Sequence, residues 1–401
     1  QDLPIERILQ ALNMPRSLDR NPLFRVMFIL QKSPAADFAG MMARAIEPDP
    51  GIARSDLLLE LAEIDGSLQG WLEYSTELFE SDTIARMATH LQTLLQSIAG
   101  DPEERISRLA LLPDAERQQI LFGFNDTRSA DRPGSFIARF ARQVARTPDA
   151  IAVSTEAVQL SYRALSDRAA AIAGRLDHSK AATEEIVILF ADRGVDLLAA
   201  MIAVQQAGLA FLPLDSALPQ ARLTEIIRHS GARTVLTTTA LQATIKAVMS
   251  ELPHKQRPRL ITVDRPARTS RRESTPVQRT PSSLACVIYT SGSTGVPKGA
   301  MIEDRGLVNH LQSKIDDLGL TGADAVAQTA PQSFVIALWQ LLAPLMVGAR
   351  VHICTESAVR DPALLMQETS RERITILQLV PSLLREILRP APRATAREAL
   401  S

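Results

Sequence analysis

The sequence has little of what secreted, membrane-spanning or nucleic-acid-binding proteins need. Its 401 residues include only two cysteines, Cys286 and Cys354, each inside an apolar run. Two cysteines cannot form the disulfide framework of a small secreted protein, so we expect two buried thiols in a cytoplasmic protein. The 44 Lys and Arg residues balance 45 Asp and Glu residues. The chain therefore has no overall positive charge with which to bind nucleic acid or an anionic membrane surface.

Long hydrophobic runs, a leader segment and metal-ligand spacing are absent too. The longest apolar run, residues 195–208, is interrupted by Asp196 and two glutamines, and it is shorter than the roughly 20 residues of a membrane span. The chain begins with Gln1 and has no basic or apolar leader, so we expect a piece of a longer protein. No metal-ligand spacing is found among the histidines, and no metal site is predicted. They are His90, His178, His229, His254, His310 and His352.

The hydrophobic residues follow one pattern before about residue 115 and another after it. The first is typical of antiparallel strands and the second of alternating strands and helices, so we predict two folding units. In the first unit, residues 56–62 and 67–74 predict two strands. Asp65-Gly66 lies between them and is a strong signal for a tight hairpin. We therefore expect an antiparallel-rich α+β unit at the start of the chain.

A long helix is expected after this hairpin. Ser81 and Asp82 can accept hydrogen bonds from its first amide groups, and Gly100 can end it in a left-handed conformation. A stripe of apolar residues at helical spacing predicts a side that faces the core. The stripe consists of Ile84, Met87, Leu91, Leu94, Leu95 and Ile98.

In the second unit, from residue 135, strands and helices alternate, which predicts a largely parallel sheet between helices. Gly208 and Gly231 should end two of the helices, and Pro219 should begin one. The expected strands cover residues 185–190, 210–214, 234–236 and 374–379, and the expected helices cover residues 195–207, 219–231 and 381 onward.

A proline-rich and arginine-rich stretch, residues 264–283, interrupts this alternation and includes Arg271 and Arg279. A short basic run in a neutral chain usually belongs to the surface, so we predict a solvated, mobile loop. The alternative is a binding segment for nucleic acid or for a protein partner.

The residues with the clearest chemistry lie at positions 284–299, where an apolar strand enters a loop of hydroxyls and glycines that ends at Lys298. The glycines allow positive φ angles and close approach to anionic oxygens, the hydroxyls donate hydrogen bonds, and the lysine adds positive charge. Pro297 stands where a Walker A loop has its second glycine, so this is not a Walker A loop. The alternative, a Gly/Ser-rich turn, has no need of a lysine and a rigid proline. We therefore predict a phosphate-binding loop, with its glycines at Gly292, Gly295 and Gly299.

The segment Tyr289-Thr-Ser-Gly-Ser-Thr-Gly-Val-Pro-Lys-Gly299 resembles the phosphate-loop motif of the adenylate-forming superfamily. That superfamily includes acyl-CoA synthetases, luciferases and the adenylation domains of nonribosomal peptide synthetases. Residues 160–169, 207–215 and 328–340 resemble the first, second and fourth core motifs of an adenylation domain. Residues 14–28 resemble the last core motif of a condensation domain, which precedes an adenylation domain in such a synthetase.

The resemblance implies an α/β fold class with two incomplete domains. Residues 1–112 would be the antiparallel-rich α+β end of a condensation domain, residues 113–134 a linker, and residues 135–401 the incomplete large α/β subdomain of an adenylation domain. Such a domain uses ATP and Mg²⁺ to adenylate a carboxylic or amino acid, and a carrier-protein domain then accepts the acyl group on its phosphopantetheine thiol. No complete catalytic set is expected, so we predict little activity from this chain alone. The ATP phosphates would be held by Thr290, Ser291, Gly292, Ser293, Thr294, Gly295 and Lys298.

The fourth motif departs from the family pattern at one position. The family has Phe-Asp there, and the aspartate binds the α-ammonium of the amino acid, whereas this chain has Phe334-Val335. The change removes a charge-assisted hydrogen bond of about 1.5–3 kcal/mol and leaves the cation unpaired. We hypothesise a substrate without an α-ammonium, such as a keto, hydroxy, aryl or fatty acid; the alternative is that Val335 belongs to the core and another residue binds the amine. The predicted pocket consists of Phe334, Val335, Ile336 and Trp339.

Two other functions stay open. One is a stand-alone acyl-CoA or aryl-acid ligase with an amino-terminal extension, and the other is a decayed module that acts as a scaffold without catalysis. A carrier domain encoded in the same gene would exclude the first, and ATP binding would argue against the second. Smaller departures from the family, without an assigned consequence, occur at Ser216, at Leu218 and at Asp304, where the family usually has histidine.

Overall fold

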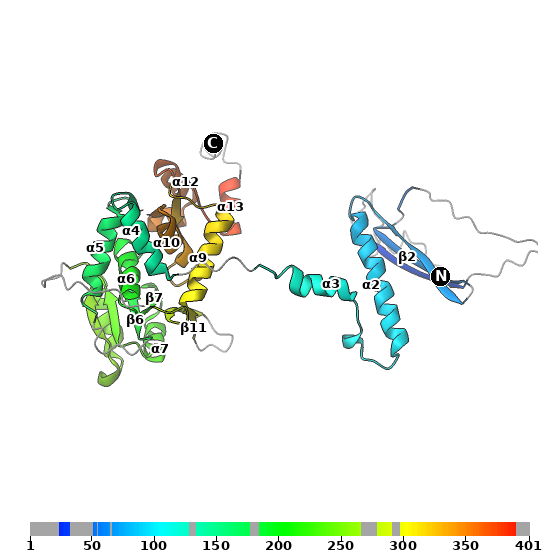
Figure 1. The fold of residues 1–401 in the computed structure, drawn as a ribbon, viewed down its shortest axis with the longest axis horizontal. Helices are drawn as coiled ribbons and strands as arrows, with labels where there is room; N and C mark the ends of the chain where they lie inside the picture. Colours follow the sequence, from blue (N-terminus) through cyan, green and yellow to red (C-terminus); the bar gives the residue numbers. More distant parts are fainter. Residues whose placement is uncertain are drawn as a thin grey trace, which may run out of the picture. The chain divides into compact units, whose positions relative to one another are not determined.

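The computed structural model describes residues 24–32, 51–53, 55–64, 66–127, 134–176, 184–265, 279–290 and 297–389. Contacts divide the chain into two units, residues 1–131 and residues 132–401 (Figure 1). None of the helices in the described ranges is both long and apolar enough to cross a lipid bilayer.

The first unit contains a three-stranded sheet in the order β1-β2-β3. β2 (Leu57–Ile64) and β3 (Ser67–Tyr74) pair antiparallel, and Ile64 faces Ser67 where the chain turns. Gly66 has a φ of 74°, a left-handed conformation that glycine adopts without steric cost. The predicted hairpin is therefore confirmed. β1 (Val26–Lys32) pairs parallel with β2, a long-range contact that the local pattern does not predict.

The helix that follows, α2 (Ser81–Gly100), is long, as predicted, but its ends differ from the prediction. Glu80 is its N-cap residue and makes no side-chain capping bond, so the predicted capping by Ser81 or Asp82 is wrong. Gly100 is still helical and the helix ends at Asp101, with a φ of −147°, so the left-handed stop is also wrong. The apolar stripe is only partly buried within the described residues. Ile84 is 6% exposed, whereas Met87, Leu95 and Ile98 are 36–39% exposed.

Three short helical segments follow α2. They are η1 (Ile106–Arg108), α3 (Asp114–Gln118) and η2 (Gln119–Gly123).

The second unit is built on two sheets. The six-stranded sheet has the order β11-β10-β7-β6-β8-β9, and all its described pairs are parallel except β10 with β11. The four-stranded sheet has the order β12-β13-β4-β5, where β12, β13 and β4 are parallel and β5 is antiparallel to β4. The strands of the larger sheet are β6 (Ile186–Phe190), β7 (Ala210–Leu214), β8 (Thr234–Thr237), β9 (Arg259–Thr262), β10 (Leu284–Thr290) and β11 (Lys298–Glu303). Those of the smaller sheet are β4 (Ile151–Ser154), β5 (Gln159–Ser161), β12 (Ala325–Gln328) and β13 (Arg350–Ile353).

Helices pack against both sheets. One core cluster contains residues of both sheets together with residues of α6 and α10, two helices that are hydrophobic on every side because they lie inside the unit. Helices α4, α5 and α6 contact one another (Figure 1). The helices are α4 (Phe136–Arg146), α5 (Tyr162–Ala173), α6 (Val195–Gln206), α7 (Gln220–Ser230), α8 (Gln242–Ser250), η3 (His254–Gln256), α9 (Asp304–Leu318), α10 (Val335–Val347), α11 (Glu356–Arg360), α12 (Pro362–Arg371) and α13 (Pro381–Leu388).

Most elements predicted for this unit are confirmed. Gly208 and Gly231 follow α6 and α7 with φ angles of 77° and 61°, and Pro219 is the N-cap residue of α7. Both cysteines are buried and free. The predicted strand at residues 374–379 is wrong, because this segment makes a single isolated bridge, between Ile376 and Val326.

The carboxyl end of the basic stretch forms a buried ion pair. Arg279 Nε lies 2.7 Å from Asp304 Oδ2, and their side chains are 1% and 2% exposed. Arg279 also donates hydrogen bonds to the carbonyl oxygens of Leu209 and Leu284, at 3.1 and 2.7 Å. The prediction of a solvated loop is therefore wrong for Arg279, while residues 266–278 of that stretch, including Arg271, lie outside the described residues.

Candidate functional site

The antiparallel pair β10–β11 carries both ends of the predicted phosphate loop. Residues 284–288 of β10 are buried, and the strand then emerges at Thr290, which is exposed. Thr290 faces Lys298 as the last pair of the ladder, and its hydroxyl lies 3.5 Å from the carbonyl oxygen of Lys298. Lys298 is exposed as well. The strand pairing thus places an exposed threonine opposite an exposed lysine at the end of the ladder, where an anionic ligand can reach both residues.

The structure brings two of the seven predicted phosphate contacts together, namely Thr290 and Lys298. The other five lie outside the described residues, and their roles stay predictions. They are Ser291, Gly292, Ser293, Thr294 and Gly295.

Gly299 has a different role from the one predicted. It is a residue of β11 and does not have a positive φ. A Cβ atom at this position would lie 3.0 Å from Val287 Cγ1 and 3.1 Å from the ring of Tyr289. The hydroxyl of Tyr289 is 2.7 Å from His229 Nδ1 on α7, and the two rings meet edge to face. Burial raises the pKa of Tyr289. Gly299 therefore allows the tyrosine that precedes the loop to pack across β11.

The segment predicted to line the acyl pocket connects β12 to α10. Phe334 is the N-cap residue of α10, and Val335 and Ile336 begin the helix. All three are exposed, by 59%, 41% and 40%. Trp339 is buried and donates a hydrogen bond from Nε1 to Gln378 Oε1 at 2.8 Å. The first turn of α10 thus brings together Phe334, Val335 and Ile336, while Trp339 lies in the core beneath them.

Two polar residues that the motif comparison did not single out hold this connection in place. Gln340 is fully buried, and its Oε1 accepts hydrogen bonds from the amides of Thr329 and Ala330 at 3.1 and 3.0 Å. Arg193 donates to the carbonyl oxygen of Thr329 at 2.9 Å and to Glu356 Oε2 at 3.0 Å. A glutamine inside an otherwise apolar helix was the available sequence signal for Gln340. Arg193 gave no comparable signal, because its partners are distant in the sequence.

Replacing Gln340 with leucine, Gln340→Leu, should remove the only acceptor that the described residues offer to these two amides. A buried donor without an acceptor costs about 1–3 kcal/mol, so the free energy of unfolding should fall by at least this amount. Urea unfolding of the whole chain measures the change. Gln367→Leu is the matched control, because Gln367 is an exposed glutamine on α12, and it should change the free energy by less than about 0.5 kcal/mol. Equal, small effects of both substitutions would contradict this role for Gln340.

Two family models match the chain. The AMP-binding enzyme family matches residues 140–401. The condensation domain family matches residues 1–121. The two matches follow one another in the order expected from the motifs, and the AMP-binding match covers well over half of the chain.

Similar proteins carry both parts in the same order. Tyrocidine synthase 2 of Brevibacillus parabrevis is 32% identical over 390 residues, which are 95% of this chain and 11% of that protein. Chondramide synthase cmdD of Chondromyces crocatus is 33% identical over 393 residues, 96% of this chain and 10% of that protein. The chain thus spans about a tenth of the length of these relatives.

Solved structures of nonribosomal peptide synthetases share the fold. A holo four-domain nonribosomal peptide synthetase bound to AMP and glycine is 25% identical, with a TM-score of 0.74 over 96% of this chain and 29% of that one. A second nonribosomal peptide synthetase, also 25% identical, has a TM-score of 0.66 over 83% of this chain and 35% of that one. The chain therefore belongs to the AMP-binding enzyme family, and its adenylation part follows a condensation part as in the nonribosomal peptide synthetases.

Proposed function

We propose that the second unit of this chain activates a carboxylic acid with ATP, forming an acyl-adenylate and pyrophosphate. The observation that carries the proposal is the β10–β11 pair, which places Thr290 opposite Lys298 at the two ends of the segment that resembles the superfamily's phosphate motif. The related synthetase that holds AMP and glycine supports a nucleotide and an acid as ligands. A carrier-protein domain of the same synthetase would then take the acyl group on its phosphopantetheine thiol.

In this reaction, Thr290 and Lys298 would bind the ATP phosphates and stabilise the negative charge that develops on them. When the substrate carboxylate attacks the α-phosphorus, negative charge builds up on the departing pyrophosphate. Lys298 would place its ammonium group near that charge, and Thr290 would donate its hydroxyl hydrogen bond. Both side chains are exposed at the sheet edge, as ligand binding requires. Mg²⁺ would accompany the nucleotide, and we assign no residue of this chain to it.

Equilibrium dialysis of the 401-residue chain against ATP tests the proposal. A phosphate-binding second unit should bind ATP, and added pyrophosphate should compete with it. A decayed scaffold would bind no ATP, and that result would overturn the proposal. The condensation match at residues 1–121 favours a synthetase over a stand-alone ligase, and a carrier domain encoded in the same gene would decide between these two.

We propose further that the acid activated here lacks an α-ammonium group. Val335 stands at the helix start where the family has an aspartate, and it is 41% exposed. No carboxylate is therefore supplied at the first position of α10 to pair with a substrate cation. Keto, hydroxy, aryl and fatty acids need no such partner.

Val335→Asp should shift the preference towards amino acids. The new carboxylate would lie in the first turn of α10, where the helix dipole favours negative charge, and it could pair with an α-ammonium. A charge-assisted hydrogen bond of about 1.5–3 kcal/mol corresponds to roughly 10–160-fold in relative kcat/KM. Pyrophosphate exchange over amino, keto and hydroxy acids, in the synthetase that contains this chain, measures the shift.

Ile336→Asp is the matched control for this substitution, because Ile336 is equally exposed on the same turn. It should lower the activity with every acid without favouring amino acids. Normal exchange by the unmodified synthetase with a common α-amino acid would refute the proposed substrate class.

We propose the domain limits implied by the motifs, with residues 1–112 as condensation part, 113–134 as linker and 135–401 as adenylation part.

We also propose a cytoplasmic location, which agrees with the two free cysteines.

A further inference from the structure

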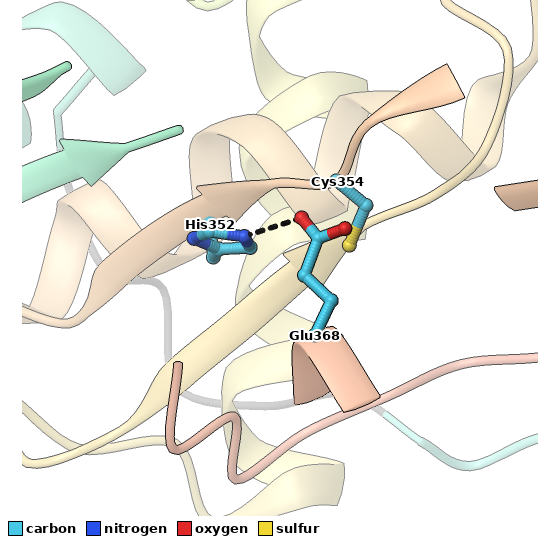
Figure 2. A group of neighbouring side chains, drawn as sticks. All are labelled: His352, Cys354 and Glu368. Carbon is cyan, nitrogen blue, oxygen red and sulfur yellow. Dashed lines mark hydrogen bonds and ion pairs between the residues drawn. The ribbon is translucent and has the colours of Figure 1, made fainter. Parts of the chain in front are cut away.

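A buried group of three possible metal ligands lies between β13 and α12 (Figure 2). His352 is in β13, and Cys354 follows two positions later, so the alternation of the strand points both side chains to the same face. Glu368 reaches them from α12. The side chains of His352, Cys354 and Glu368 are 0%, 3% and 4% exposed, and their ligand atoms all lie within 4.8 Å of one another.

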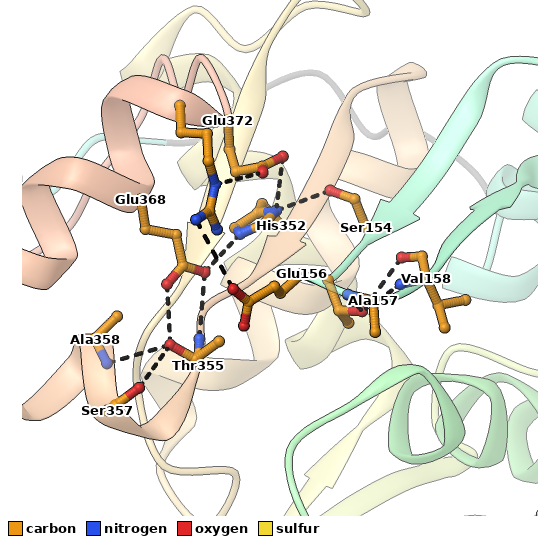
Figure 3. Close-up of polar contacts among 12 residues, drawn as sticks. Ser154, Glu156, Ala157, Val158, His352, Thr355, Ser357, Ala358, Glu368 and Glu372 are labelled. Atoms are coloured by element: carbon orange, nitrogen blue, oxygen red, sulfur yellow. Dashed lines mark hydrogen bonds and ion pairs between the residues drawn. The ribbon is translucent and has the colours of Figure 1, made fainter.

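Outer contacts orient each of the two ligands that carry nitrogen or oxygen (Figure 3). His352 Nε2 lies 2.8 Å from Glu368 Oε1, while its Nδ1 lies 2.9 Å from the Ser154 hydroxyl and 3.7 Å from Glu372 Oε2. Thr355 donates its amide to Glu368 Oε1 and its hydroxyl to Glu368 Oε2, at 3.3 and 3.0 Å. A histidine that binds a metal normally donates its second ring N–H to an oxygen of this kind. The Ser154 hydroxyl is placed to accept that bond, and the Glu372 carboxylate lies at ion-pair distance from the same nitrogen.

The charges of the group favour a divalent cation. A thiolate and a carboxylate together carry two negative charges, which one divalent cation neutralises in a site that water does not reach. Thiolate, imidazole and carboxylate are the ligands that zinc prefers.

We infer that His352 Nε2, Cys354 Sγ and a carboxylate oxygen of Glu368 bind one zinc-class divalent cation. Bond lengths of about 2.0–2.3 Å around a tetrahedral zinc place ligand atoms roughly 3.3–3.6 Å apart. The His352–Glu368 contact of 2.8 Å would therefore open by about half an ångström. The second Glu368 oxygen would complete the four ligands. The cation would tie β13 to α12.

This cation would act as a structural brace, separate from the ATP chemistry of the β10–β11 loop. Thr355, which holds Glu368, directly precedes Glu356, the partner of Arg193. Arg193 in turn binds the Thr329 carbonyl at the start of the segment before α10. The proposed metal therefore stabilises the part of the second unit that supports this segment.

Cobalt titration of the chelator-treated 401-residue chain tests the inference. We expect one equivalent of Co²⁺ to bind with a thiolate-to-cobalt charge-transfer band, and one equivalent of Zn²⁺ to remove the band. Cys354→Ala should abolish the band, whereas Cys286→Ala, which removes the other buried thiol, should retain it. Ser154→Ala should keep the band and weaken metal affinity about 10–100-fold, because it removes the outer partner of His352.

A measurement on the unmodified chain tests the inference without depending on whether a variant folds. Stoichiometric Zn²⁺ should raise its melting temperature, since a ligand that binds only the folded state stabilises it. A cobalt spectrum without a charge-transfer band, or a band that survives Cys354→Ala, would overturn the inference. So would a melting temperature unchanged by Zn²⁺. ATP binding tests the proposed function separately, so the metal-site inference and the proposed function can fail independently.

Discussion

Asp304→Ala is expected to lower the free energy of unfolding of the second unit by about 3–5 kcal/mol, because it leaves a buried guanidinium without its carboxylate. Arg279 and Asp304 are almost completely buried. The two carbonyl oxygens that Arg279 also contacts cannot neutralise its charge. Removing one partner of such a pair costs far more than the pair itself contributes, since the remaining charge has lost its solvation by water.

Urea unfolding followed by tryptophan fluorescence can measure this change in one unit. The chain has two tryptophans, Trp71 in the first unit and Trp339 in the second. In a Trp71→Phe background, fluorescence reports on the second unit alone, and Asp304→Ala should move its transition to lower urea.

Two controls separate the buried charge from a general effect of mutation. Glu303→Gln, at the exposed pair with Arg305, should cost at most about 1 kcal/mol. Combining Asp304→Ala with Arg279→Met should recover much of the loss, since no charge is then left unpaired. A cost below about 1 kcal/mol for Asp304→Ala, or a double variant no more stable than the single one, would contradict the argument.

This ion pair also explains one departure from the family pattern and shows why it could not be predicted. The sequence shows Asp304 where the family usually has histidine, and shows Arg279 in a basic stretch that resembles a surface loop. The two residues are 25 positions apart. Only the folded chain reveals that the carboxylate and the guanidinium compensate each other inside the unit. From their charge alone, both side chains would be expected at the surface. They are buried because each neutralises the other.

Local backbone chemistry, by contrast, predicted much of the fold. Gly231 and Gly208 follow helices with positive φ angles, and Pro219 starts α7, because these residues restrict or free their own backbone. Gly100 shows the limit of such signals. A glycine permits a left-handed ending without requiring it, and α2 continues through Gly100 to end at Asp101.

The candidate site was predictable where its residues are close in sequence. Thr290 and Lys298 belong to one motif, and the β10–β11 pairing places them opposite each other. His352 and Glu368 are 16 positions apart on different elements. No spacing rule for metal ligands connects such residues, so a sequence pattern could not point to this cluster. Their contact depends on how α12 packs against β13, and a single sequence does not encode that packing as a local pattern.

The second large effect concerns catalysis. Lys298→Ala should lower the kcat of ATP–pyrophosphate exchange by about 10²–10³-fold in the synthetase that contains this chain, which corresponds to about 2.7–4 kcal/mol of transition-state stabilisation. The ammonium group would act mainly on charge that develops on the leaving pyrophosphate, so KM for ATP should change much less than kcat. Steady-state exchange rates over a range of ATP concentrations separate the two parameters.

Lys314→Ala is the matched control, because Lys314 is a partly exposed lysine on α9 whose nearest ion-pair partner is Asp317 on the same helix. It removes the same positive charge at a position away from the β10–β11 loop and should leave exchange unchanged. Lys298→Arg keeps the charge with a different shape, and it should recover part of the rate but not all of it, because a planar guanidinium does not replace a compact ammonium group in a fitted site. An unchanged kcat in Lys298→Ala, or an equal loss in Lys314→Ala, would show that the lysine at the end of β10–β11 does not carry the phosphate chemistry. A loss confined to KM would instead mean that Lys298 binds ATP equally in the ground state and the transition state.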